Sequence, residues 1–166
     1  METWHEFYLL IGTAGAALTG LLFVVVSLGS RVVAHDQTTG VKAFLSPNAV
    51  HFTTTLVVSA MFLVPNLPAA VIGSLLCAGA IGAVVYLVST NAHAHWQRNR
   101  LSFLDWIWFI ALPVATYCLL LLSGLGLLLQ VTWSMHGVAV ASILLLVVGI
   151  RNAWDIVIWM SRREHK

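Results

Sequence analysis

The sequence predicts an all-α membrane protein, a five-helix transmembrane bundle, and three observations lead to this fold class. Of the 166 residues, 60% are hydrophobic and 8% are charged, with a mean hydropathy of +0.93. A soluble domain carries about a quarter charged residues. The charges are clustered, so that long uncharged stretches separate them, and the basic residues outside those stretches fall on one side of the predicted bundle. We expect a single transmembrane domain over residues 1–166.

The uncharged stretches determine the number of helices. Asp, Glu, Lys and Arg are all absent from residues 7–30, 43–97 and 106–150, which are 24, 55 and 45 residues long. A spanning helix needs about 20 residues to cross the hydrocarbon core. The first stretch therefore holds one helix, and each of the others holds two.

Two short segments mark the places where the longer stretches fold back. "VPNLP" contains Pro65 and Pro68, which remove backbone donors and push the preceding residues out of helical geometry. "QVTWSMHG", residues 130–137, divides the last stretch. The predicted helices cover 8–30, 46–64, 69–91, 104–128 and 135–160.

The positions of lysine and arginine predict the orientation. In the five-helix arrangement, every basic residue outside a helix lies in the two long loops or the C-terminal tail: Arg31, Lys42, Arg98, Arg100, Arg162, Arg163 and Lys166. The positive-inside rule places these segments in the cytoplasm. The N-terminus is then outside and the C-terminus cytoplasmic. The basic residues thus serve topology, and we expect no nucleic-acid partner.

A polar stripe is predicted on the second helix, which opens with "SPNAVHFTTTLVVSA". Ser46 is a natural N-cap and Pro47 suits the first helical position. The polar residues that follow recur at intervals of three and four, which places them on one helix face. They are Asn48, His51, Thr55 and Ser59.

A charged pair interrupts the apolar sequence of the fifth helix, in "GIRNAWDIVIW". Arg151 and Asp155 are four residues apart, so they share a helix face and are able to pair. A lone charge at the bilayer centre costs about 2.5–3.5 kcal/mol on insertion scales. We therefore expect the pair to face protein, with Trp154 buried beside Asp155.

The second and fifth helices are predicted to share one polar layer in the inner leaflet. By helical rise from the inner end, Asp155 lies about 8 Å deep and Arg151 about 14 Å deep. His51 and Thr55 fall at similar depths, and Asn152 is placed to add hydrogen bonds. This layer is the candidate site for an ion or proton.

Small residues at four-residue spacing occur on two of the predicted helices. One row is Gly12, Ala16 and Gly20, and the other is Ala70, Ser74, Ala78 and Gly82. Such rows let helix backbones approach closely inside a membrane. They serve contacts within the protomer or between protomers, and two rows in one small chain favour a homo-oligomer.

Enzymatic chemistry is not indicated. The sequence contains no nucleophile–base pair, carboxylate dyad or metal-ligand cluster at a recognisable spacing, and its loops are too short to house a cofactor. We expect no catalytic residue, no bound metal and no cofactor.

Three segments carry a family resemblance: "AGAALTGLLFVVVSL", "LSPNAVHFTTTLVVSAMFLVP" and "GIRNAWDIVIW". They resemble a group of uncharacterised small bacterial polytopic integral membrane proteins. The resemblance implies a multi-pass location in the bacterial inner (cytoplasmic) membrane. It implies no activity, because none is assigned to the group.

Two functions from different classes are consistent with the residues. The first is a small oligomeric channel or carrier that handles a cation or proton through the polar layer, with Asp155 or His51 binding the ion or relaying the proton. The second is a non-transporting accessory or regulatory membrane protein in which the Arg151–Asp155 pair is structural. Whether Asp155 faces a hydrated cavity distinguishes the two.

Overall fold

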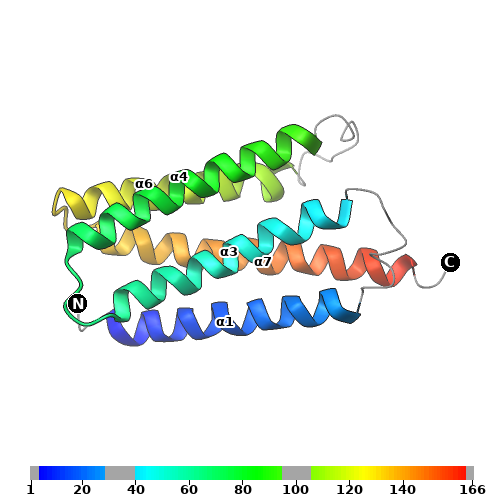
Figure 1. Ribbon diagram of the computed structural model, residues 1–166, viewed down its shortest axis with the longest axis horizontal. Coiled ribbons are helices and arrows are strands. Elements are labelled where there is room, and N and C mark those ends of the chain that lie inside the picture. Colours follow the sequence, from blue (N-terminus) through cyan, green and yellow to red (C-terminus); the bar gives the residue numbers. More distant parts are fainter. Residues whose placement is uncertain (1–3, 29–39, 95–105, 164–166) are drawn as a thin grey trace.

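The computed structural model describes residues 4–28, 40–94 and 106–163, and within these ranges the chain is helical with no strand. Five long helices are present, and a short π-helix, η3 (Ile107–Ala111), leads directly into one of them (Figure 1). The five are α1 (His5–Leu28), α3 (Gly40–Leu63), α4 (Ala69–Ala94), α6 (Leu112–Leu128) and α7 (Ser134–Arg163). The all-α prediction is confirmed.

Four helical segments are long and apolar enough to cross a membrane, which identifies a multi-pass membrane protein. They are His5–Ser27, Ala69–Ser89, Ile107–Leu128 and Ser134–Asp155. The remaining long helix, α3, has sufficient length but carries an asparagine, a histidine and three consecutive threonines in its central part. These polar residues make α3 less apolar than the four spanning segments.

The N-terminal boundary of α3 differs from the prediction. The helix begins at Gly40, six residues before the expected start, so Ser46 lies inside the helix and is not its N-cap. Pro47 is likewise internal. Because proline already has a helical φ angle, the helix continues through it at the expense of one backbone hydrogen bond.

The two tight connections lie where the sequence predicts them. Between α3 and α4, Asn66 adopts a left-handed φ of 57°. After α6, Gln130 has a φ of 56°, and the N–H of Val131 donates to the carbonyl of Gly126 at 2.8 Å. The N–H of Gln130 donates to Leu127, which completes a Schellman motif and ends the helix.

The π-helix has a local cause in the sequence. Pro113 has no N–H to donate to the carbonyl four residues earlier, so a regular α-helix cannot pass through this turn with all its bonds. The N–H of Leu112 instead donates to Ile107, five residues back. This wider turn lies where Trp108 is close to Arg151 of α7.

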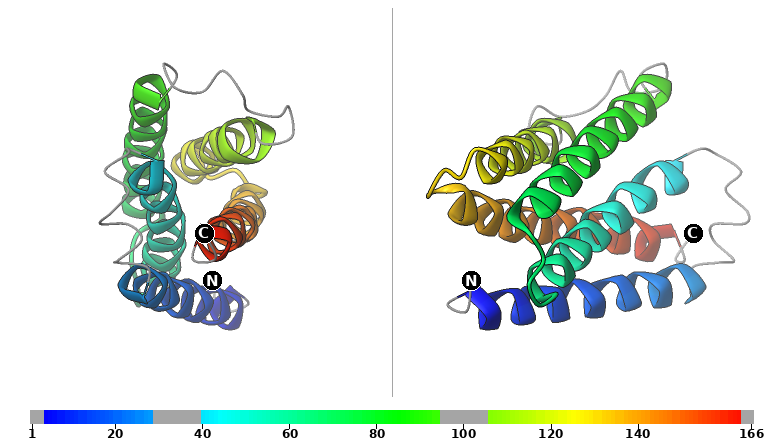
Figure 2. Two further views of the ribbon diagram at one scale, coloured as in Figure 1. Left: turned by 90° about the vertical axis from the view of Figure 1, so that its right-hand side faces the viewer. Right: turned by 60° about the vertical axis from the view of Figure 1, so that its left-hand side comes forward.

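The long helices form two packed pairs with α7 against both. α1 packs along α3, α4 packs along α6, and α7 contacts α3 and α6 (Figure 1). α3 and α4 diverge from their short connection, which is clearest in the right-hand view of Figure 2. The larger buried core involves all five long helices, and a smaller cluster joins α1, α3 and α7 around Phe52.

α4 and α6 approach each other closely through two glycines. A Cβ atom placed on Gly73 would lie 2.8 Å from the carbonyl oxygen of Gly124. The small-residue row predicted on α4 is not part of this contact, because its four members, Ala70, Ser74, Ala78 and Gly82, are all exposed. On α1, Gly12 contacts Ser59, whereas Ala16 and Gly20 are exposed. Both rows therefore place small residues on the outer surface of the protomer.

Candidate functional site

The four polar residues of the α3 stripe face the interior of the bundle. Their side chains have no exposed area. They recur over three helical turns, so they form a continuous line along one face of α3. The line consists of Asn48, His51, Thr55 and Ser59, and we call it the α3 seam. The predicted stripe is thus present, and in this structure it lies inside the protomer.

α7 contributes Asn152 to the same interior region. Asn152 is 2% exposed. On α3, the ring of Phe52 packs so closely on Gly149 of α7 that a Cβ atom on this glycine would overlap it. The two helices run in opposite directions (Figure 1). Asn48 precedes Phe52 by about one turn and Asn152 follows Gly149 by about one turn, so both amides lie about 5 Å from this contact toward the same end of the bundle.

His51 is linked to α6 by a hydrogen bond that joins two buried side chains. Its Nδ1 atom lies 3.0 Å from the hydroxyl oxygen of Tyr117, and neither residue is exposed. The two rings are 5.6 Å apart at their centroids. Thr54 Oγ1 lies 3.4 Å from the same tyrosine oxygen, and Thr55 donates to the carbonyl of His51 at 3.0 Å. The histidine is therefore held from one side only.

Several polar atoms of this region are buried without a hydrogen-bond partner. In the described residues they include both side-chain atoms of the Asn48 amide, His51 Nε2, Ser59 Oγ and Asn152 Oδ1. An unpaired buried amide or hydroxyl costs about 1–3 kcal/mol in protein mutational data. Donors and acceptors are both present, and this combination can bind water, which needs two to four polar partners.

The charged pair forms but does not face the interior as expected. Arg151 Nη1 and Asp155 Oδ2 make a salt bridge, and their side chains are 41% and 32% exposed. The guanidinium also lies over the ring of Trp108, 5.9 Å from its centroid. On a helix, residues 151 and 155 both lie to the same side of residue 152, rotated from it by about 100° and 60° about the helix axis. Because Asn152 points inward, the pair lies on the flank of α7.

The position of Trp154 also differs from the prediction. Its side chain is 64% exposed, so it is not buried beside Asp155. It lies on the opposite side of α7 from Asn152, because two residues correspond to about 200° of helical rotation. The polar layer shared by α3 and α7 thus contains Asn152, with the pair and Trp154 outside it.

Tyr117 and Thr54 belong to the site and were absent from the predicted set. Tyr117 lies in an otherwise apolar part of α6, where a lone tyrosine is a weak signal for a polar contact. Thr54 is a neighbour of Thr55 in a run of three threonines, and sequence spacing alone assigns it to another face. In the part of the chain that the structure describes, no three side chains of His, Cys, Asp or Glu converge as a metal site would require.

The chain matches no protein-family model, no curated protein and no solved structure.

Proposed function

We propose that this protein is a small oligomeric channel or carrier that moves a proton or a small cation along the α3 seam. The observation that carries the proposal is the buried, incompletely hydrogen-bonded line of side chains on α3. Such a line is unfavourable in a dry interior because its donors and acceptors lack partners. Water or a transported species would supply these partners.

His51 is the residue on this line that can carry a charge. Imidazole ordinarily titrates near neutral pH and acts as a proton shuttle. Its Nδ1 is bonded to Tyr117 and its Nε2 is buried without a partner. One nitrogen is thus anchored and the other is available for exchange with water. Asn48, Asn152, Thr55 and Ser59 provide neutral hydrogen-bonding groups beside it.

The charged pair has a different role in this proposal from that of the seam. Arg151 and Asp155 lie on the flank of α7 next to Asn152, and each is partly exposed. At that position they would set the electrostatic potential at the inner end of the path. With the basic loops and tail in the cytoplasm, as the positive-inside rule favours, this is the cytoplasmic end in a bacterial inner membrane.

An accessory or regulatory membrane protein is the second candidate. Two observations favour it. In the salt bridge, the charges of Arg151 and Asp155 neutralise each other on one face of α7. The guanidinium also lies over the ring of Trp108, and both contacts stabilise the fold. The exposed small-residue row on α4 would also admit close packing of another transmembrane helix.

Ion flux through purified protein in liposomes distinguishes the two candidates. With an internal pH-sensitive dye and separate Na⁺ and K⁺ gradients, we expect passage of protons or of one cation above protein-free liposomes. His51→Ala should bring the flux to the protein-free level, and Asp155→Asn should change its rate or pH dependence. The matched control is His5→Ala, because His5 is exposed at the start of α1. Liposomes that stay tight to all three ions, with folded protein, would favour the accessory function.

A further inference from the structure

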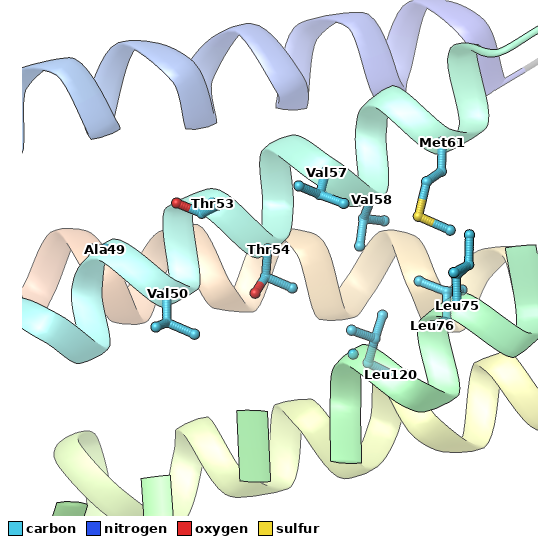
Figure 3. A pocket seen from close by; sticks show the side chains of 11 residues that line it. Ala49, Val50, Thr53, Thr54, Val57, Val58, Met61, Leu75, Leu76 and Leu120 are labelled. Carbon is cyan, nitrogen blue, oxygen red and sulfur yellow. The ribbon is translucent and has the colours of Figure 1, made fainter. Parts of the chain in front are cut away.

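A groove of about 360 Å³ lies between α3 and α4, on the side of α3 next to the seam (Figure 3). It exists because the two helices diverge from their connection, as Figure 2 shows. Gly79 contributes to it, because a Cβ atom placed there would have no heavy atom within 4 Å. Its lining includes Thr53, Thr54, Val57, Met61, Leu75 and Leu76.

The lining of the groove selects an uncharged occupant from the bilayer. Its walls are mostly aliphatic, and no charged side chain is among the residues that line it. Val57 and Leu75, on opposite walls, are 49% and 51% exposed. Leu75 lies in the membrane-spanning segment Ala69–Ser89 and Val57 lies on the facing helix, so we infer that both side chains face hydrocarbon. The groove thus opens to hydrocarbon, and an ion or a polar solute would lose its solvation on entering.

The groove has the size of a small-molecule site, with a volume of about 360 Å³. This volume lies at the small end of the range of about 300–1,000 Å³ for small-molecule sites.

Hydroxyl groups give the groove a specific polar contact. Thr53 and Thr54 carry the side-chain oxygens of the lining, and Thr54 points from α3 toward the space between the helices (Figure 3). The Thr54 oxygen lies 3.4 Å from the Tyr117 hydroxyl, whereas O–H···O bonds are usually about 2.5–3.0 Å long. The tyrosine makes its shorter contact with His51, at 3.0 Å. The Thr54 hydroxyl is therefore weakly engaged and can bond to an occupant.

We propose that this groove binds a bilayer-soluble amphiphile whose apolar chain carries one uncharged hydrogen-bonding group, a hydroxyl or a carbonyl. The polar group bonds to Thr54, and the chain lies along Val57, Met61, Leu75 and Leu76. Because Thr54 also touches Tyr117, the partner of His51, occupancy alters the hydrogen bonding of the histidine. This regulatory consequence rests on the proposed function; the binding itself does not.

Photo-crosslinking in liposomes tests the binding. The probes are a long-chain alcohol carrying a diazirine and a diazirine alkane of the same chain length, with labelled peptides identified by mass spectrometry. We expect the alcohol to label the α3 and α4 walls of the groove more than the alkane does. Thr54→Val should reduce this preference about fivefold, as expected for the loss of one ordinary hydrogen bond.

Thr13→Val is the control, because Thr13 is an exposed threonine on α1 that donates to its own helix. It should leave the labelling unchanged. Any of three results would overturn the proposal. They are equal labelling by the two probes, an unaltered preference for the alcohol in Thr54→Val, and exclusion of both probes by a second copy of the chain. Labelling is read without any ion gradient. Liposomes that are tight to ions but labelled in the groove would therefore reject the proposed transport and leave this site in place.

Discussion

Gly73→Ala should lower the free energy of unfolding by about 2 kcal/mol, within the usual range for overpacking. The new methyl group would stand 2.8 Å from the carbonyl oxygen of Gly124 and 3.0 Å from Leu128 Cγ. A backbone oxygen in the middle of a helix cannot rotate away from the contact. α4 and α6 would therefore move apart along their whole packed length. Thermal or denaturant unfolding of the purified protein in a fixed detergent measures the change.

Gly82→Ala on the same helix is the matched control. A Cβ atom on Gly82 would have no heavy atom within 4 Å, and the residue is exposed. Alanine also favours the helix by up to about 1 kcal/mol relative to glycine. This variant should be as stable as the wild type or more stable. Equal destabilisation by the two substitutions would contradict the glycine-mediated packing of α4 on α6.

Asn48→Leu should stabilise the fold and abolish the flux together. Both polar atoms of the Asn48 side chain are buried without a partner, so removing them relieves about 1–3 kcal/mol of desolvation cost. Leucine has the same branching at Cγ and cannot hold water or pass a proton. The expected result is a higher unfolding temperature with flux at the level of protein-free liposomes. Opposite changes in stability and activity are a common feature of functional sites.

Thr116→Val provides the comparison for Asn48→Leu. Thr116 is also buried, but its hydroxyl donates to the carbonyl of Leu112 within its own helix and lies outside the α3 seam. Its replacement should leave both stability and flux near the wild-type values. If Asn48→Leu instead lowers the stability, the Asn48 amide makes favourable hydrogen bonds in the folded protein. That result would contradict the claim that its polar atoms lack partners.

Features that depend on local sequence patterns were predictable. The lengths of the uncharged stretches predict helix number, because the membrane excludes charge over a fixed thickness. The spacing of Asn48, His51, Thr55 and Ser59 predicts a shared face, and a polar face in a membrane bundle is most stable inside it. The two turns follow from residues that break helices, and both occur near the predicted positions.

Features that depend on how the helices are rotated and paired were not predictable. The four-residue spacing of Arg151 and Asp155 shows that they share a face, but the direction of that face depends on the packing of α7. Asn152 takes the interior position, and the pair is left on the flank. The partnership of His51 with Tyr117 joins residues 66 positions apart, and the groove arises from the divergence of two whole helices. No local pattern contains this information.

We expect the α3 seam to open to water in the working protein. Silver ion tests it directly, because Ag⁺ is a small aqueous cation that reacts with thiols. Single cysteines are placed at Thr55 in the seam and at Val57 on the lipid-facing side, in a background lacking Cys77 and Cys118. The folded protein is treated with Ag⁺, then denatured and exposed to an alkylating reagent. We expect the cysteine of Thr55→Cys to be protected from alkylation and that of Val57→Cys to be alkylated. If the cysteine of Thr55→Cys is unprotected, or if both cysteines are protected equally, the seam does not open to water.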